Sequence, residues 1–227
     1  MTADKDMSEE EASSLFNYGV ACVGERANVF AGTQRTYVVL GVSRGGTSAI
    51  SGLLSHFGVY MGRSGQAPLF ENLKMNKALR GSNEDVQQVV SKFNREHDVW
   101  GFKGNAIPQS YSEVSSMLRN PVYVVVFRDL LAIANRAMLS ANRDILNIMN
   151  RQLKEYQRII EFVNQRQNYF VLVSYEKLTA YPEAVVSRIA RGVDIAPGSD
   201  QLSAATAFIT PAPANYLKVS RAKKSNK

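Results

Sequence analysis

Residues 36–54, TYVVLGVSRGGTSAISGLL, carry the strongest fold signal in the chain. Thr36–Val42 is a short run of β-branched and apolar residues, which is typical of a strand buried on both faces of a parallel sheet. The glycine-bearing turn Ser43–Gly46 follows, and from Thr47 apolar residues recur at helical spacing as far as Gly58, a residue suited to a helix C-terminus. The stretch therefore predicts a strand, a tight loop and a helix.

The same alternation of patterns continues along the chain. Further apolar runs predict strands at 99–103, 121–127 and 169–174. Helical spacing recurs at 71–95, 111–118, 130–162 and 182–191, with one break expected near 142–144. Strands that alternate with helices predict an α/β domain, with a doubly wound, mainly parallel sheet flanked by helices, as in P-loop NTPases.

The balance of charge favours anionic partners. The chain has 227 residues, and its 27 Lys and Arg against 20 Asp and Glu give a formal net charge of +7. Five of the cations lie in Lys218–Lys227, where we expect a solvated terminus, with contact to a membrane surface or nucleic acid as the alternative. As partners we expect a small-molecule or glycan acceptor, no nucleic acid, and at most a peripheral membrane contact through this tail.

The cysteine count and the first residues indicate the compartment. Cys22 is the only cysteine, which rules out an internal disulfide and a cysteine-rich zinc site. The acidic start MTADKDMSEEE is not followed by an uninterrupted apolar stretch of about 18 residues, which argues against a signal peptide or membrane span. We therefore expect a cytoplasmic protein. Residues 8–20 have the pattern of a capped helix, so residues 1–35 are expected to form an N-terminal helical lead-in.

The loop after the first strand has the features of a phosphate site. A turn from a buried strand into a helix directs backbone N–H groups to one point, where the helix dipole adds positive charge. Gly41–Ser48 nearly meets the Walker spacing, but Thr47 stands in place of the lysine and Arg44 lies inside the loop. An ATPase or kinase would need that lysine and an acidic magnesium ligand. A nucleotide whose single 5′-phosphate carries another leaving group suits this loop better.

This loop resembles the 5′-phosphosulfate loop of the PAPS-dependent sulfotransferases, whose donor is 3′-phosphoadenosine 5′-phosphosulfate. The match consists of Arg44, Gly45, Gly46, Thr47 and Ser48, with Gly45 in place of the family's serine. The resemblance implies that these residues bind the 5′-phosphosulfate and that Arg44 also acts as a catalytic cation. The alternative is a glycine-rich turn without a ligand.

A second segment, Val124–Arg136 (VVVFRDLLAIANR), resembles the 3′-phosphate segment of the same family. The resemblance implies that Arg128 clamps the 3′-phosphate of the donor, and a guanidinium suits phosphate oxygens because it can bind two of them at once. Two positions depart from the family pattern, since Leu130 replaces a proline and Arg136 replaces a serine ligand. Arg136 is either a second cation for this phosphate or a surface residue.

Two further segments indicate catalytic groups. Trp100–Lys103 (WGFK) is similar to a segment of bacterial and protein-tyrosine sulfotransferases, which implies that Lys103 lies at the transferred sulfuryl group; the alternative is a solvated lysine at a strand end. Residues 68–76 (PLFENLKMN) resemble the segment that carries the family's glutamate base, which makes Glu71 the candidate base or else a glutamate at a helix N-terminus. Other branches use a histidine. The histidines of this chain are His56 and His97.

Together with Val173–Leu178 (VSYEKL), which resembles a structural stretch of the family, the matches extend over about residues 36–190. They imply a sulfotransferase-like domain at 36–216, followed by a basic tail at 217–227. We expect sulfuryl transfer from PAPS to a hydroxyl of a glycan, glycolipid or small molecule, with PAP as product and no metal ion. Two other hypotheses stay open: a nucleotide-dependent kinase or related phosphotransferase, and a catalytically silent nucleotide-binding protein, which the departures from the family pattern favour.

Overall fold

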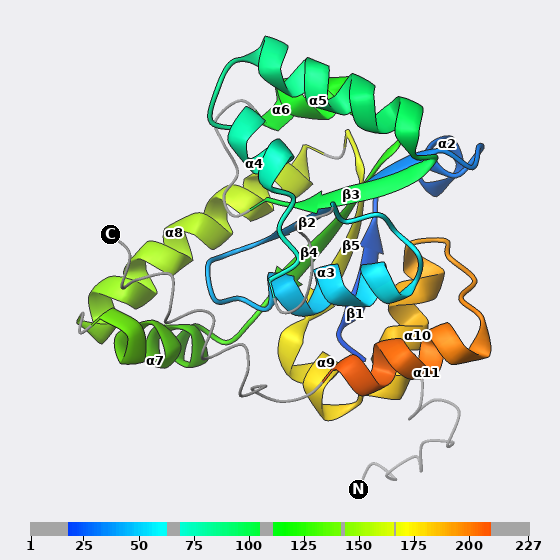
Figure 1. Cartoon of the computed structure of the whole chain (residues 1–227). Coiled ribbons are helices and arrows are strands. Elements are labelled where there is room, and N and C mark those ends of the chain that lie inside the picture. The colour runs from blue at the N-terminus through cyan, green and yellow to red at the C-terminus, as the bar shows by residue number, and fades with distance from the viewer. Residues whose placement is uncertain (1–17, 63–68, 105–110, 142–143, 166, 210–227) are drawn as a thin grey trace, which may run out of the picture.

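The computed structural model describes residues 18–62, 69–104, 111–141, 144–165 and 167–209. Within these residues a five-stranded sheet, in the order β1-β5-β4-β2-β3, lies at the centre and carries helices on both faces (Figure 1). The strands are β1 (Val20–Val23), β2 (Arg35–Gly41), β3 (Val99–Lys103), β4 (Pro121–Phe127) and β5 (Tyr169–Ser174). The strands β2, β3, β4 and β5 are parallel to one another. The edge strand β1 pairs with β5 in the antiparallel sense.

The helices occupy the segments between and after the strands. They are α2 (Arg26–Val29), α3 (Thr47–His56), α4 (Leu73–Ala78), α5 (Asn83–Glu96), α6 (Tyr111–Met117), α7 (Leu130–Ala141), α8 (Ile145–Asn164), α9 (Tyr175–Ala180), α10 (Pro182–Gly192) and α11 (Ser199–Phe208). The expected break separates α7 from α8, where the Asp144 carboxylate accepts a hydrogen bond of 2.8 Å from the backbone N–H of Asn147.

The strand β1 was not anticipated from the sequence. It has only four residues, VACV, of which Ala21 and Cys22 are exposed, and the sequence pattern places Val20 at the end of a helix. Val20 pairs with Val173, which attaches part of the expected helical lead-in to the sheet as an edge strand. The helix expected at 8–20 and the basic tail at 217–227 lie largely or wholly outside the described residues.

The prediction of an α/β fold with a mainly parallel sheet flanked by helices is confirmed. The finer description as a doubly wound sheet of the P-loop type stays a prediction. Among the helices of the described residues, none is both long enough and apolar enough to cross a membrane.

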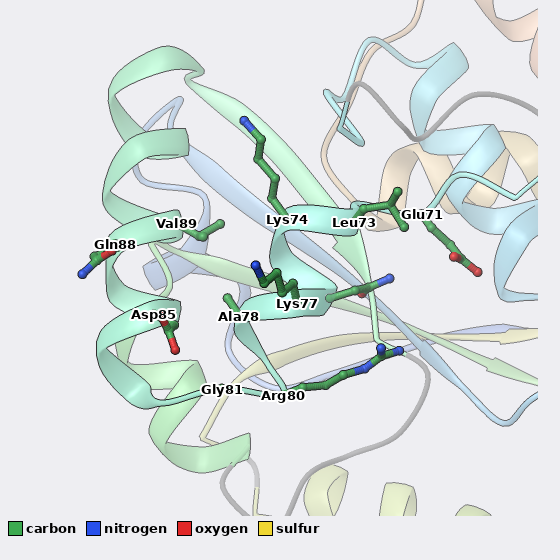
Figure 2. Close-up of a pocket in the computed structure, with 11 residues that line it drawn as sticks. Glu71, Leu73, Lys74, Lys77, Ala78, Arg80, Gly81, Asp85, Gln88 and Val89 are labelled. Atoms are coloured by element: carbon green, nitrogen blue, oxygen red, sulfur yellow. The ribbon is translucent and has the colours of Figure 1, made fainter.

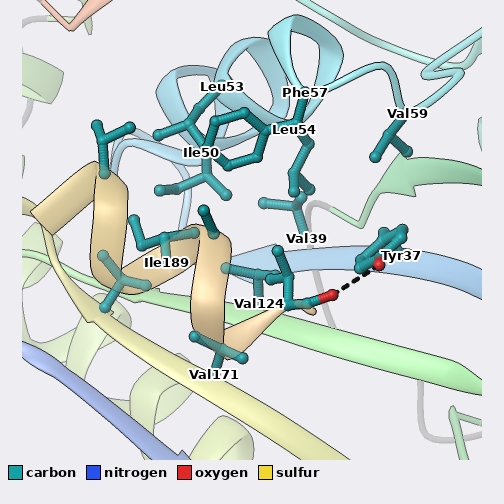
Figure 3. Close-up of a cluster of buried hydrophobic side chains, with 14 of the residues drawn as sticks. Tyr37, Val39, Ile50, Leu53, Leu54, Phe57, Val59, Val124, Val171 and Ile189 are labelled. Carbon is teal, nitrogen blue, oxygen red and sulfur yellow. Dashed lines mark hydrogen bonds between the residues drawn. The ribbon is translucent and has the colours of Figure 1, made fainter. Parts of the chain in front are cut away.

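Both faces of the sheet are buried because helices cover each of them. On one face, Tyr37 and Val39 of β2 pack in a cluster with α3, α10 and α11, and Figure 3 shows part of this cluster between the strands, α3 and α10. On the other face, Val38 and Leu40 pack with side chains of α4, α5, α6 and α8. Burial on both sides explains why the strands are continuous apolar runs instead of alternating ones.

The strand order points to a ligand-binding edge. The chain adds β3 on one side of β2 and then β4 on the other, so the direction of addition changes at β2 and β4. In open α/β sheets, ligands bind at the carboxyl ends of the strands where this change occurs. The loop after β2 and the first residues after β4 lie at that edge.

Buried tyrosine hydroxyls make the fold sensitive to high pH. Tyr37 Oη donates to the Val193 carbonyl at 2.7 Å, and Tyr156 Oη donates to the Arg128 carbonyl at 3.0 Å. Burial is the main cause that raises the pKa of each tyrosine to about 12. An unfolded tyrosine has a pKa of about 10, so the unfolded state releases these protons first and the fold loses stability as the pH rises from 10 towards 12.

We predict that urea denaturation yields a smaller free energy of unfolding at pH 11 than at pH 8, by about 1 kcal/mol for each of these tyrosines. Tyr37→Phe should be less stable than wild type by about 1–2 kcal/mol at pH 8, because the Val193 carbonyl loses its hydrogen-bond donor. Its free energy of unfolding should, however, fall less than that of wild type between pH 8 and pH 11, because one buried hydroxyl is absent. The control Tyr181→Phe removes the hydroxyl of a tyrosine that is 45% exposed and should change the free energy of unfolding at pH 8 by less than about 0.5 kcal/mol. Equal wild-type stability at both pH values would contradict this account.

Candidate functional site

The loop from β2 into α3 turns through two left-handed backbone positions. The N–H of Gly45 donates to the Val42 carbonyl at 2.9 Å, and Arg44 within this turn has a φ of 69°. Gly46, with a φ of 98°, is the N-cap of α3. A left-handed conformation costs a residue with a side chain about 1–2 kcal/mol, and such strain is typical of functional sites. The turn leads directly into the N-terminus of α3, where backbone N–H groups have no partner within the helix.

Two close contacts explain the glycines of this loop. A Cβ at Gly46 would lie 2.2 Å from Cδ2 of Tyr175, and a Cβ at Gly45 would lie 2.8 Å from the Val42 carbonyl oxygen. The family's serine at the position of Gly45 would therefore collide with the turn that this chain forms. The departure at Gly45 has a structural reason, and Gly46 is required for both its backbone conformation and its contact with Tyr175.

Arg128 follows β4 and reaches across to the loop. Its Nη1 donates to the Arg44 carbonyl at 3.0 Å, and its Cζ lies 4.5 Å from the centre of the Tyr175 ring, within cation–π distance. Its Nε is buried and has no hydrogen-bond partner in the structure. An unpaired buried donor typically costs about 1–3 kcal/mol, so this N–H is the kind of group that a bound anion would satisfy.

Tyr156 of α8 fixes the backbone of Arg128. Its hydroxyl accepts a hydrogen bond from the Arg128 N–H at 2.8 Å and donates one to the Arg128 carbonyl at 3.0 Å. One residue further on, the N–H of Asp129 donates to Glu176 Oε1 at 3.0 Å. These contacts hold the end of β4, and therefore the base of the Arg128 side chain, in one position.

Lys103 and Glu71 meet at the other side of the loop. Lys103, the last residue of β3, is only 3% exposed, so the alternative of a solvated lysine is wrong. Its Nζ donates to Ser48 Oγ at 3.1 Å and to the Leu69 carbonyl at 2.9 Å, and it lies 3.6 Å from Glu71 Oε1. The Ser48 hydroxyl in turn donates to the Leu69 carbonyl at 3.3 Å. A buried ammonium group requires such oxygen partners, and they bring the predicted cation, base and loop hydroxyl together.

The other predicted residues differ in how close they lie to the loop. Thr47, at the first position of α3, is buried, and Arg136 lies about two turns into α7 and is half-buried. His56 ends α3, about 14 Å along the helix from Thr47, and its ring lies 5.2 Å from that of Phe208. His97 stacks on Tyr60 with ring centres 3.7 Å apart, at the end of β3 opposite Lys103. The structure therefore brings neither histidine to the loop.

The sequence interpretation missed two residues of this site. Tyr175 was assigned to a structural stretch and Tyr156 was not considered, yet Tyr175 contacts both Gly46 and Arg128. Tyr175 follows β5 directly, so its place at the carboxyl edge of a parallel strand was a usable signal. Tyr156 had no comparable signal, because its contact with Arg128 joins positions 28 residues apart. Within the described residues, no group of three or more His, Cys, Asp and Glu is arranged to hold a metal ion.

Comparisons with known proteins leave the family open. No protein family and no curated protein matches the sequence. Among solved structures, the chain is similar to the unliganded structure of a sugar kinase from Janibacter sp. HTCC2649, with 17% sequence identity, 72% of this chain and 96% of that chain covered, and a TM-score of 0.44. A likeness of this size carries no argument about function. Membership of the PAPS-dependent sulfotransferases therefore stays a hypothesis.

We predict that Gly46→Ala lowers the free energy of unfolding by about 2 kcal/mol or more, because it combines left-handed strain with displacement of the Tyr175 ring. Gly32→Ala is the matched control, since a Cβ at Gly32 would meet no atom within 4 Å, and it should change stability by less than about 0.5 kcal/mol. Urea denaturation measures both. Equal effects of the two substitutions would show that the contact with Tyr175 does not constrain the loop.

Proposed function

We propose that the protein is a sulfotransferase that binds PAPS at the carboxyl ends of β2 and β4. The observation that carries the proposal is the guanidinium of Arg128, whose Nε is buried without a partner beside the glycine loop. One of its N–H groups is bound to the loop itself, and a guanidinium carries five, so it can hold the loop and a phosphate together. Tyr175 and Tyr156 keep it in place for this role.

The donor's two phosphate groups would occupy different parts of this edge. The backbone N–H groups of Gly46, Thr47 and Ser48, at the N-terminus of α3, suit the 5′-phosphosulfate, with Arg44 as a nearby cation, whereas the N–H of Gly45 closes the turn by donating to the Val42 carbonyl. Arg128, with Arg136 as the second cation proposed, would bind the 3′-phosphate. This division distinguishes PAPS from ADP and ATP, which have no 3′-phosphate.

The transfer step uses the pair on the other side of the loop. The acceptor hydroxyl oxygen forms a bond to sulfur, and the bond between sulfur and the 5′-phosphate oxygen breaks, so that PAP leaves with the electron pair. The hydroxyl proton passes to Glu71, which acts as general base. Lys103 lies 3.1 Å from Ser48 Oγ and 3.6 Å from Glu71 Oε1, so its charge orients the base and offsets negative charge that develops at the start of α3.

A second candidate is a phosphotransferase that uses ATP and Mg²⁺. The missing lysine of the Walker pattern argued against it, but Lys103 reaches the loop's Ser48 from β3 and supplies an ammonium group at the same helix N-terminus. A cation therefore reaches this loop from a different strand. The buried Nε of Arg128 favours a phosphate at β4 as well, which is the reason for placing PAPS first.

Calorimetric titration of the full chain with PAP, with ADP, and with ATP and Mg²⁺ distinguishes these candidates. We predict that PAP binds more tightly than ADP and does not need Mg²⁺. Arg128→Ala should weaken PAP binding by about 2 kcal/mol, or roughly 30-fold, because a charged hydrogen-bonding partner is lost. The control Arg95→Ala removes an exposed cation of α5 and should leave PAP binding within about twofold of wild type.

Other outcomes of the titration decide against this proposal. Equal affinities for PAP and ADP would exclude a specific 3′-phosphate site. Tighter binding of ATP with Mg²⁺ than of PAP would favour the phosphotransferase. Tight PAP binding in the titration, combined with no sulfuryl transfer from PAPS to neutral or sulfated oligosaccharides in a separate activity assay, would favour the catalytically silent nucleotide-binding protein.

A further inference from the structure

A cavity of about 810 Å³ lies beside the proposed transfer site, on α4, on the first half of α5 and on the segment that joins them (Figure 2). The residues that line it come from the segment between Glu71 and Val89 of the sequence. The volume is within the range of about 300–1,000 Å³ that small-molecule sites occupy. Glu71 connects this cavity to the loop, because the residue is part of the cavity lining and its carboxylate lies 3.6 Å from Lys103 Nζ. A molecule in the cavity would therefore lie next to the proposed base.

The cavity carries an excess of positive charge away from Glu71. Lys74, Lys77 and Arg80 line it at intervals of three residues, which places them on neighbouring positions of one side of α4 and its continuation. All three are exposed. Among the described residues that line the cavity, the only acidic one besides Glu71 is Asp85, and its Oδ2 accepts a hydrogen bond of 2.9 Å from the Ser82 N–H in the capping box of α5. This part of the cavity therefore has three cationic side chains and one carboxylate, that of Asp85, which is already hydrogen-bonded within the capping box of α5.

The remaining lining is suited to a hydroxylated ligand. Asn76 and Gln88 offer amide groups that donate and accept hydrogen bonds. The apolar side chains among the described residues of the lining are Leu73, Ala78 and Val89.

We propose that this cavity is the acceptor site and that the acceptor is an anionic saccharide, a sugar that already bears a sulfate, phosphate or carboxylate group. The inference rests on the proposed function. The acceptor's charge pairs with Lys74, Lys77 and Arg80, and one of its hydroxyl groups is directed towards Glu71. The three cations thus select an acidic acceptor and place it so that Glu71 can take the proton.

The test measures binding of labelled, sulfated cellotetraose to the full chain by fluorescence anisotropy, with neutral cellotetraose as the uncharged comparator. The triple variant Lys74→Gln, Lys77→Gln, Arg80→Gln should weaken binding of the sulfated probe by tenfold or more. The matched control Lys92→Gln, Arg95→Gln, Lys154→Gln removes the same charge from exposed positions outside the cavity lining and should stay within about twofold of wild type. PAP affinity, measured by calorimetry, should be unchanged in both variants.

The outcomes separate this inference from the proposed function. Equal losses in the two triple variants would show that binding is only a response to net charge, and no loss in the cavity variant would exclude this site. Tight binding to phosphatidylcholine vesicles that contain phosphatidylinositol phosphate, without binding of the sulfated probe, would show that the cations contact a lipid headgroup and would overturn the saccharide assignment. A third outcome separates the two proposals. If wild type does not bind PAP, but the cavity variant binds the sulfated probe more weakly than the control variant does, then the PAPS proposal is wrong and the anion site in the cavity is supported.

Discussion

The junction between β2 and α3 is the constraint on which the rest of the site depends. Gly46 adopts a left-handed backbone directly against the ring of Tyr175, and the same ring lies under the guanidinium of Arg128. Three strands therefore contribute to one point: β2 through the loop, β4 through Arg128 and β5 through Tyr175. Because a side chain at Gly46 would displace the ring, the position of the helix N-terminus and that of the nearest cation are fixed together.

Positive charge lies on both sides of this junction, and each charged group is held differently. Lys103 is almost fully buried and its ammonium contacts three oxygen groups, so its charge is largely compensated within the protein. Arg128 is compensated less completely, because its Nε is buried without a hydrogen-bond partner. Lys103 is therefore fixed beside Glu71 and the start of α3, where its charge acts, whereas Arg128 has an N–H donor left for a ligand.

The sequence predicted the layers of the fold well because the parallel strands are buried on both faces and therefore stand out as apolar runs. The edge strand β1 was missed because it is short and half of its residues are exposed. For the candidate site, the sequence pattern predicted the loop, Arg128, Lys103 and Glu71, and the structure places Arg128 and Lys103 in contact with the loop and Glu71 beside Lys103. The pattern could not show that Leu69 supplies a carbonyl to Lys103, because a backbone contact does not depend on residue identity. The choice between PAPS and ATP is likewise not decided by the loop motif, because Lys103 reaches Ser48 from another strand.

We propose that one donor nucleotide lies across the carboxyl ends of β2 and β4. A crystal structure of the protein with PAP bound tests this placement. We expect the 5′-phosphate within hydrogen-bond distance of the backbone N–H groups of Gly46, Thr47 and Ser48, and the 3′-phosphate bonded to the Arg128 guanidinium, including its Nε. PAP bound elsewhere, or bound at the loop with its 3′-phosphate turned away from Arg128, would contradict it.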